Sequence, residues 1–192
     1  MSIYTEVELR ELGFAKFGKN LHISKKASFY GTAQITLGDN IRIDDFCVLS
    51  AGDGGIEIGS FIHIGVFSSI IGSAKIKLSD YCNISSKVAI YSSNDDYSGD
   101  FMTNPMVPSK FTNVKHAPVI IGKHTIIGSG TVVLPGANIE EGCAVGALSL
   151  VVKPIASWGI FAGIPVRYIK KRNNNVLSLE QEFSKKYNKE KL

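Results

Sequence analysis

Two adjacent carboxylates are the residues of this sequence whose types and spacing best suit proton transfer. Asp95 and Asp96 follow Asn94 in the polar stretch YSSNDDYSG. A carboxylate within hydrogen-bonding reach of a nucleophile accepts its proton, and a second acid beside it raises its pKa. Asn and Asp also favour turns, so simple turn formation explains the same three residues equally well. The stretch is therefore a candidate site for a general base or a polar anchor, with a turn as the alternative.

Four histidines are further candidate bases: His22, His63, His116 and His124. His116 closes the polar segment that contains Asp95, and a histidine base is therefore open as an alternative. A single histidine is more often structural than catalytic. A zinc site built from histidines would need three of them, two of them close together in the sequence, whereas His116 and His124 are eight residues apart. We predict no metal site.

The three cysteines give no disulfide or zinc pattern, because their number is odd and no CxxC spacing occurs. Cys47, Cys82 and Cys143 each stand two residues before an aliphatic residue, and packing in the interior is their expected role.

Charge and hydropathy exclude several classes of protein. The net charge of +4 over 192 residues is concentrated near the C-terminus, and aromatic residues are not interleaved with the basic ones, so nucleic-acid binding is not expected. No apolar run reaches the roughly 18 residues of a membrane span. The N-terminus MSIYTEVELR lacks the apolar core of a signal peptide. We expect a cytoplasmic protein.

The elements that must position these residues follow from a repeat of six. Over residues 119–152 the large aliphatics stand six residues apart, at Ile121, Ile127, Val133, Ile139, Val145 and Val151. The residues two places upstream of them are almost all small. A period of six is neither helical nor a simple alternation. It is the hexapeptide repeat of a parallel β-helix, in which each hexad supplies one short strand and one turn and three hexads form one coil.

The same period occurs earlier in three interrupted triplets, and it predicts coils from about residue 21 onward. The triplets are Leu37, Ile43 and Leu49; Ile58, Ile64 and Ile70; and Leu78, Ile84 and Ile90. Between Ile90 and Ile121 the repeat is broken by a long polar stretch, which we expect to be a loop extruded from the coils. Loops of this length in a compact domain are usually functional or disordered.

The two ends of the chain depart from the repeat. Thr5 and Glu8 match a capping box and predict a short helix over residues 5–12, whose Val7, Leu9 and Leu12 would cover the open end of the coils. Near the C-terminus, Val176, Leu179, Phe183 and Tyr187 have helical spacing. The predicted fold is all-β, a left-handed parallel β-helix with short N-terminal and C-terminal helices. We divide it into an N-terminal helical cap (residues 1–20), a β-helix (21–153) with an extruded loop (92–118), and a C-terminal tail and helix (154–192).

The hexads, together with the tail GALSLVVKPIASWGIFAGIPVRYIKKR, resemble the left-handed β-helix acyltransferases that use acyl-coenzyme A. The match covers nearly the whole chain, and in that family the tail around a G-x-P element helps to hold coenzyme A. The resemblance implies acetyl-CoA as co-substrate, no metal, and a homotrimer with active sites between subunits. Small corner residues would approach the pantetheine, cations would meet the phosphates, and a proline would border the adenine. The residues in question are Ser129, Gly130, Ala147, Lys153, Arg167, Lys170 and Pro165.

The stretches RIDDFCVLS and NISSKVAIYSSNDDYSG, the loop that follows them and the N-terminal helix are similar to a narrower group. These are bacterial N-acyltransferases that act on dTDP-4-amino-4,6-dideoxy-D-glucose (dTDP-viosamine). The resemblance implies that Asp95 positions the sugar amine or accepts its proton and that Ser85 orients the reacting groups. Arg42 is a candidate partner for the nucleotide phosphates, with Tyr91, Tyr97 and Phe101 as candidate walls of the sugar pocket.

The function expected from this resemblance is N-acetylation of the 4-amino group of a dTDP-4-amino-4,6-dideoxy sugar for a bacterial surface glycan such as O-antigen or capsule. An O-acetyltransferase that acts on a polysaccharide or another hydroxyl acceptor is the main alternative, and it would need His116 or His124 as base. A zinc-binding or non-catalytic β-helix scaffold is a third. The sequence leaves open whether Ser85 and Asp95 meet, because residues ten apart need not share a face of the prism.

Overall fold

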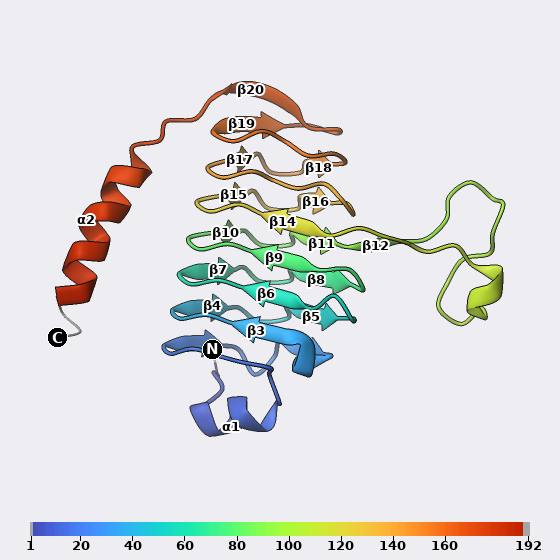
Figure 1. Cartoon of the computed structure of the whole chain (residues 1–192), viewed down its shortest axis with the longest axis horizontal. Coiled ribbons are helices and arrows are strands. Elements are labelled where there is room, and N and C mark those ends of the chain that lie inside the picture. Colours follow the sequence, from blue (N-terminus) through green and yellow to red (C-terminus); the bar gives the residue numbers. More distant parts are fainter. Residues whose placement is uncertain (1, 190–192) are drawn as a thin grey trace.

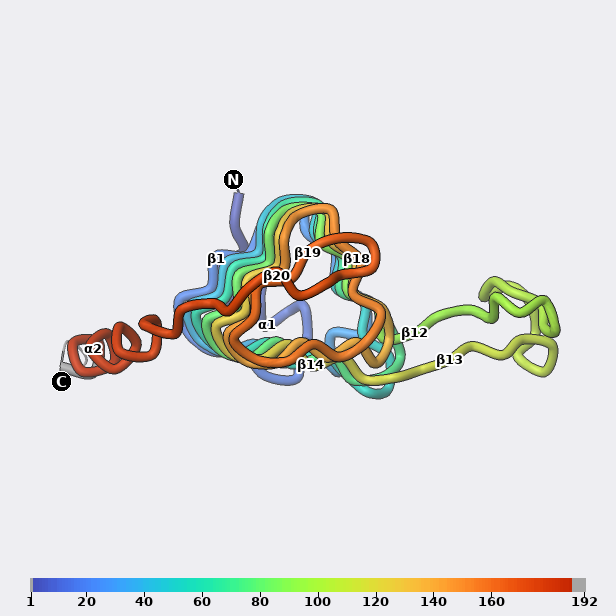
Figure 2. The backbone as a smooth tube through the Cα atoms, turned by 90° about the horizontal axis from the view of Figure 1, so that it is seen from above, coloured from blue at the N-terminus to red at the C-terminus, as the bar shows by residue number. Residues whose placement is uncertain are grey.

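The coils of the chain stack into a three-sided prism (Figures 1 and 2). The computed structural model describes residues 2–189 and is a left-handed parallel β-helix with one helix near each end of the chain, which confirms the predicted fold class. Each of the first four coils gives one short strand to each of three faces, which we number in the order in which the chain visits them. Above them, face 3 continues as isolated bridges at Ile139 and Ile155. The corners between the faces are called corner 1–2, corner 2–3 and corner 3–1.

The three faces are parallel sheets, apart from one antiparallel strand at the top of face 1. Face 1 consists of β1 (Leu21–Ile23), β4 (Ile41–Ile43), β7 (Ile62–Ile64), β10 (Asn83–Ile84), β15 (Ile126–Ile127), β17 (Ala144–Val145), β19 (Gly159–Ala162) and β20 (Arg167–Lys171). Face 2 consists of β2 (Ser28–Tyr30), β5 (Val48–Ala51), β8 (Ser69–Gly72), β11 (Ala89–Tyr91), β16 (Val132–Val133) and β18 (Leu150–Val151). Face 3 consists of β3 (Ile35–Leu37), β6 (Ile56–Ile58), β9 (Ile76–Leu78) and β14 (Val119–Ile121), with the 3-10 turn η1 (Thr32–Gln34) leading into β3.

The register of these strands builds the core as a set of aliphatic columns. Ile43 pairs with Ile64, Ile64 with Ile84 and Ile84 with Ile127, and each of the four is fully buried. Along each strand, successive side chains alternate between the inside and the outside of the prism, so His63 points outward between the buried Ile62 and Ile64. The hexad aliphatics are therefore the core, as predicted.

The three cysteines lie inside the prism, where its corners meet the core, as expected. Cys47, Cys82 and Cys143 are all buried and unpaired. Burial raises the pKa of Cys47 to about 11 and that of Cys82 to about 12. Because a thiol with such a pKa carries almost no thiolate at neutral pH, these side chains act as packing residues rather than nucleophiles.

The N-terminal end is closed by α1 (Glu6–Glu11). Thr5 Oγ1 accepts a hydrogen bond from Glu8 N, and Thr5 N donates to Glu8 Oε2 at 2.8 Å, so the capping box is confirmed. Leu9 is buried against the core, and Leu12 packs beside it. Our expectation for Val7 was wrong, because Val7 projects from the opposite side of the helix and is 66% exposed.

The outward surfaces of the three faces differ in character. On face 2 the outward side chains are largely apolar and half-buried, namely Val48, Ile71, Tyr91, Val132, Leu134 and Leu150. On face 3 they include Glu57, which pairs with Lys75 and Lys77. On face 1 the lower coils carry Arg42 and His63. In the described part of the chain no helix has the length and apolar character needed to cross a bilayer.

Replacing a core aliphatic is expected to lower stability strongly. Ile64 is fully buried between two coils, so Ile64→Ala leaves a cavity that the rigid stack cannot close, and we expect a loss of about 2–5 kcal/mol in the free energy of unfolding. Urea denaturation followed by circular dichroism measures it. Val7→Ala, on the exposed side of α1, is the control and is expected to change stability by less than about 0.5 kcal/mol. Equal effects of the two substitutions would contradict the assignment of the core.

Candidate active site

The polar segment between β11 and β14 leaves the prism at corner 2–3 and stands out from it (Figure 2). Its two arms pair as the antiparallel strands β12 (Ser93–Asn94) and β13 (Lys115–His116), with Ser93 opposite His116. Beyond them the chain forms a lobe that contains the 3-10 turn η2 (Ser109–Phe111). The extruded loop expected from the broken repeat is thus a two-stranded arm with a lobe at its end.

A cleft of about 640 Å³ lies where this arm meets corner 2–3. Its lining includes Asp95 and His116 from the arm, Ser50 and Ser73 from the corner, and Pro105 and Val107 from the lobe. His116 Nδ1 lies 2.8 Å from Ser93 Oγ, a contact that orients the imidazole ring. The cleft therefore presents one carboxylate and one imidazole to the same space, and either of them is chemically able to take a proton.

Asp96 has a different role from Asp95. Its Oδ2 accepts hydrogen bonds from Ser98 N at 3.0 Å and from Ser98 Oγ at 2.5 Å, and Ser98 Oγ in turn accepts from Asp100 N. The hydrogen bond from the Ser98 hydroxyl is the main reason that the pKa of Asp96 lies below its ordinary value. Asp96 thus remains ionised and forms the turn, while Asp95 is exposed and lines the cleft. Turn formation and candidate chemistry are divided between the two acids.

Ser85 lies at corner 1–2, at the other end of β11 from Asp95. Residues 88–92 of face 2 separate the two corners, on the order of 13 Å at about 3.3 Å per residue. Ser85 N donates to Ile127 O at 3.0 Å, and Ser85 O accepts from the buried Ser68 hydroxyl at 3.0 Å, so its backbone is fixed from above and below. Within one chain Ser85 and Asp95 are therefore not in contact.

The small residues predicted to approach a cofactor lie above Ser85 at the same corner. Gly130 N donates to Ser86 O at 3.1 Å, and Leu148 N donates to Ser129 O at 2.8 Å, so residues 85–86, 129–130 and 147–148 stack on successive coils. Ser129 and Ala147 are exposed. Gly130 has φ +72, and a Cβ there would lie 2.7 Å from the Leu148 side chain. The corner is thus narrow and exposes its backbone.

The tail residues predicted for the same cofactor lie near the top of the prism. Lys153 follows β18, Pro165 sits in the turn between β19 and β20 after a cis peptide bond, and Arg167 and Lys170 lie on β20. All four are exposed. Arg167 and Lys170 share β20 on face 1, whereas Lys153 lies beyond the end of β18, at corner 2–3.

The four residues predicted to hold the sugar nucleotide are not brought together in one chain. Tyr97 and Phe101 are exposed in the arm and lobe, and Tyr91 is half-buried on face 2. Arg42 is on face 1, where its Nε donates to Asp44 Oδ1 at 2.7 Å. The outward side of face 1 and the arm lie on different sides of the prism.

His124 contacts the C-terminal helix. Phe61, Tyr81 and His124 stack at corner 3–1 with ring centroids 5.0 Å apart at each step. The helix α2 (Val176–Lys189) runs down beside the prism (Figure 1) and contacts this stack. Phe183 packs edge-on against Phe61 at 5.2 Å. Glu180 receives hydrogen bonds from Lys123 Nζ at 2.6 Å and contacts His124 Nε2 at 2.8 Å. His124 is therefore a docking residue for α2, far from the cleft.

Acid is expected to release α2. Burial acts to raise the pKa of Glu180, but the hydrogen bonds from Lys123 and His124 outweigh it and hold the pKa below its ordinary 4.5. A carboxylate with a lowered pKa contributes stability above its unfolded value and loses it as the pH falls through the folded value. The protection of the α2 amides, that is, their exchange rate relative to the intrinsic rate at the same pH, should therefore fall below about pH 4.5. In the Glu180→Gln variant, the amides of α2 should exchange fast already at neutral pH.

Glu182→Gln is the matched control for this prediction, because within the described part of the chain Glu182 pairs with Lys186 on the exposed side of the same helix. It should leave the exchange of α2 unchanged. Equal acceleration in both variants would show that general helix charge, and not the contact with corner 3–1, sets the stability of α2.

Two features of the site were missed in the sequence. Phe46 and Phe67 stack at corner 1–2, and Ser93 orients His116. The two phenylalanines stand one coil apart, 21 residues, which is the same separation as between the buried Ile43 and Ile64. Comparing outward positions across coils at that separation would have found them.

Among residues 2–189 no group of three or more His, Cys, Asp or Glu side chains is placed to hold a metal ion.

Known proteins resemble this chain over nearly its full length. The dTDP-4-amino-4,6-dideoxy-D-glucose acyltransferase of Escherichia coli is 52% identical over 183 residues, which is 95% of each chain. The crystal structure of AntD, an N-acyltransferase from Bacillus cereus in complex with dTDP and 3-hydroxybutyryl-CoA, is 43% identical with a TM-score of 0.93, over 97% of this chain and 98% of that one. No family model matches the sequence.

A further structure of AntD contains dTDP-4-amino-4,6-dideoxyglucose and coenzyme A, in a variant with a serine replaced by cysteine. It is 41% identical with a TM-score of 0.90, over 96% of this chain and 98% of that one. Other variants of AntD replace an aspartate ten positions after that serine.

Proposed function

The chain belongs to the dTDP-4-amino-4,6-dideoxy-D-glucose acyltransferases, and from this membership we propose that it transfers an acetyl group from acetyl-CoA to the 4-amino group of dTDP-4-amino-4,6-dideoxy-D-glucose. The sequence identity of 52% over 95% of the chain is the observation that carries this proposal. We place the enzyme in the cytoplasm. Its product would be the activated sugar for a glycosyltransferase that builds a bacterial surface glycan.

Asp95 is the proton acceptor of the proposed reaction. The amine nitrogen attacks the thioester carbonyl, the new C–N bond forms, the C–S bond breaks, and the nitrogen gives up a proton as the thiolate of coenzyme A leaves. Asp95 is an exposed carboxylate in the cleft, free of the hydrogen bonds that occupy Asp96. It is suited to hold the amine and to take its proton.

Ser85 is the second residue of the proposed site. In AntD the substituted serine and aspartate are ten positions apart, and Ser85 and Asp95 have the same separation. A hydroxyl at this position can donate a hydrogen bond to the thioester oxygen, on which negative charge develops. The fixed backbone of Ser85 supports such an orienting role.

The site is completed by a second copy of the chain. Ser85 and Asp95 lie at opposite ends of the apolar face 2, while corner 3–1 is already covered by α2. Packing of face 2 and the arm of one copy against corner 1–2 of the next would bring Asp95 of one copy to Ser85 of the other. This contact joins different surfaces of the two copies, and such a head-to-tail contact forms a ring of three when each copy is rotated by one third of a turn from the last. We infer a homotrimer with three such sites.

Coenzyme A would extend upward from Ser85 along corner 1–2. Ser129, Gly130 and Ala147 expose backbone there to the pantetheine. Arg167 and Lys170 of the same copy, with Lys153 at corner 2–3 of the copy packed against it, would meet the phosphates, which are matched best by charged donors, and Pro165 would border the adenine. The residues suggested for the sugar nucleotide could meet only across such an interface. Tyr97 and Phe101 would come from one copy and Arg42 from the next, and Tyr91 would lie on the face between them.

One observation favours a second function. His116 faces the cleft with its ring oriented by Ser93, and a hydroxyl acceptor needs a stronger base than an amine does. O-acetylation of a sugar hydroxyl is therefore the alternative, and His116→Ala separates the two. It should abolish O-transfer and leave N-transfer largely intact.

The test of the proposed function is mass-spectrometric detection of N-acetylated product from acetyl-CoA and dTDP-4-amino-4,6-dideoxy-D-glucose. 3-Hydroxybutyryl-CoA is the competing donor, since AntD has been crystallised with it. Product from acetyl-CoA at a higher kcat/KM supports the acetyl assignment. Faster transfer of the longer group would assign a longer acyl donor. Absence of N-acylated product with both donors would overturn the proposal.

A further inference from the structure

The last strand of the prism, β20, is held along one edge. Within residues 2–189 it pairs with β19 and with no other strand, and the register of this pair shifts between Ile160 and Phe161. Tyr168 packs edge-on against Phe161 at 5.7 Å, but all five residues of β20 are exposed. A strand with one neighbour and few buried contacts has low local stability, so its position depends on how its ends are fixed.

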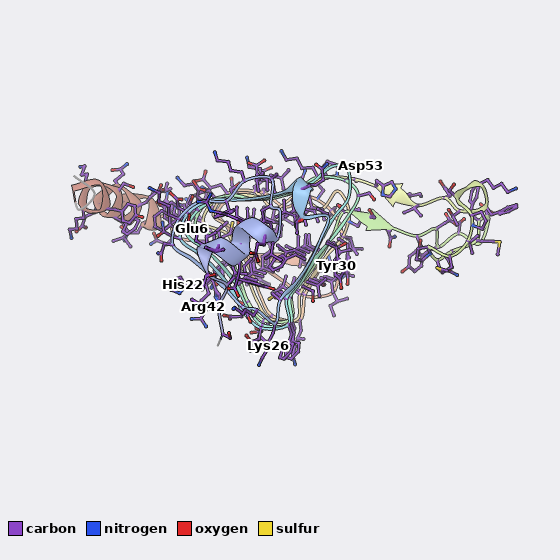
Figure 3. The ribbon with its side chains drawn as sticks, turned by 90° about the horizontal axis from the view of Figure 1, so that it is seen from below. Glu6, His22, Lys26, Tyr30, Arg42 and Asp53 are labelled. Atoms are coloured by element: carbon purple, nitrogen blue, oxygen red, sulfur yellow. The ribbon has the colours of Figure 1, made fainter. Side chains whose placement is uncertain are left out.

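The two ends of β20 lie at different corners. Arg167 pairs with the end of β19 at corner 1–2, above the small residues proposed for the pantetheine, and Lys171 pairs with the start of β19 at corner 3–1. Face 1 joins these two corners. Figure 3 shows α2 projecting from corner 3–1, Arg42 along face 1 and Lys26 at the apex that forms corner 1–2. The strand therefore connects the corner proposed for coenzyme A with the corner that α2 contacts.

Arg172 fixes the end of β20 at corner 3–1. Its backbone N donates to Trp158 O at 2.8 Å. Its Nη1 donates to His124 O at 2.8 Å, to Gly142 O at 3.2 Å and to Cys143 O at 2.9 Å. Hydrogen bonds from a guanidinium are stronger than those between neutral groups. One side chain thus ties the end of β20 to the backbone of two lower coils.

The helix α2 fixes one of these acceptors. His124 is buried, its Nε2 contacts Glu180 at 2.8 Å, and its ring stacks on Tyr81, against which Phe183 packs edge-on at 6.3 Å. The side chain of His124 therefore contacts α2 while its carbonyl oxygen accepts from Arg172. Arg172, His124, Glu180 and Phe183 together form what we name the clasp.

The strand that the clasp holds carries positive charge without acidic neighbours in the sequence. Residues 142–179 contain no Asp or Glu. Arg167 and Lys170 are exposed on β20, so a shift of the strand would move both cations at once. Recognition of phosphate by charged donors depends on their geometry. The position of β20 therefore decides whether the two cations can meet the phosphates together.

We propose that the clasp holds β20 where Arg167 and Lys170 meet the phosphates of coenzyme A, so that α2 sets the affinity for the donor without touching it. The inference deepens the proposed function and rests on it through the placement of the phosphates. Arg172, Glu180 and Phe183 are positioning residues, because they act through β20.

Hydrogen exchange tests the first step, from α2 to β20. Glu180→Gln combined with Phe183→Ala, the clasp variant, should release α2 and lower the protection of the β20 amides, while β7 and β10 on the same face keep theirs. Arg172→Ala breaks the clasp at its other end and should also lower the protection of β20. Glu182→Gln, on the exposed side of α2, is the matched control and should change neither element. Retained protection of α2 or of β20 in the clasp variant would overturn the proposal.

Calorimetric binding of coenzyme A tests the second step, from β20 to the cofactor. The clasp variant should bind coenzyme A about tenfold more weakly, the size expected from one lost hydrogen bond to a charged group. Arg167→Ala combined with Lys170→Ala should weaken binding as well. Adding the clasp substitutions to that variant should change nothing further, because effects that act through the same residues are not additive. Full additivity would show that α2 influences the cofactor by another route and would overturn the proposal.

Three controls separate positioning from a general loss of stability. The ligand dTDP, which the AntD crystal contains, should bind the clasp variant as it binds the wild type. Phe183→Tyr retains the ring and should bind coenzyme A like the wild type. In turnover, the KM for acetyl-CoA should rise in the clasp variant while kcat at saturation stays the same. Equal losses of affinity for dTDP and coenzyme A would contradict the assignment.

The outcome is separable from that of the proposed function, because exchange of β20 and binding of coenzyme A require no turnover. Clasp-dependent binding of coenzyme A without acyl transfer in the wild type would support the clasp and contradict the acetyl transfer. Transfer by the wild type with clasp-independent binding of coenzyme A would do the reverse.

Discussion

Asp95→Asn should lower kcat by about a hundredfold or more, since a positioned general base contributes effects of this order. Asparagine keeps the size of the side chain and its ability to accept a hydrogen bond, but it cannot take a proton. The binding of dTDP and coenzyme A should therefore stay the same. The rate of product formation under saturating substrates is the measurement.

Asp96→Asn is the matched control, because the neighbouring carboxylate is bound by Ser98 in the turn. We expect it to loosen the arm and to leave kcat near that of the wild type. A larger loss from Asp96→Asn than from Asp95→Asn would reverse the roles assigned to the two acids.

The pH dependence distinguishes a base from an anchor. If Asp95 takes the proton, Asp95→Asn stays slow at every pH that the fold tolerates. If Asp95 only holds an amine that arrives deprotonated, the variant should recover as the pH rises toward the pKa of the amine, because more free amine becomes available. Full recovery at high pH would therefore contradict the role of general base.

The fold could be predicted from the sequence because its signal is local and repeated. The hexad pattern shows which side chains point inward, and the register between coils follows because similar units stack on one another. The alignment of Ile43, Ile64 and Ile84 therefore needs no knowledge of distant contacts. The cysteines follow from the same rule, since a position two residues before an aliphatic one is buried. Even the capping box of α1 lies within four residues.

The site could be predicted only in part, because it depends on contacts between distant parts of the chain. Asn40 Nδ2 donates to Tyr187 OH across 147 positions, and Arg172 Nη1 donates to His124 O, Gly142 O and Cys143 O. No periodicity indicates that α2 returns to corner 3–1 and occupies His124. Asp95 was a candidate from its residue type and its polar surroundings, whereas Ser85 was recognised only through resemblance. Their separation on two corners became visible only once the loop and the coils were placed in space.

Mixed trimers of two damaged chains should recover activity, and this is the strongest test of a site shared between copies. In a trimer assembled at random from Ser85→Ala and Asp95→Asn chains, a site is intact when its serine comes from the second variant and its aspartate from the first. For a closed ring of three equivalent contacts this occurs at about one quarter of the sites. Neither variant alone contains any such site. Co-expression with two affinity tags isolates the mixed species.

A second mixture fixes the arrangement quantitatively. When chains with both substitutions are mixed equally with wild-type chains, shared sites again stay intact at about one quarter, whereas sites confined to one chain stay intact at about one half. A first mixture without recovery, together with one half in the second, would place Ser85 and Asp95 in the same chain. Since residues 88–92 keep these two side chains at different corners of one prism, we expect recovery in the first mixture and about one quarter in the second.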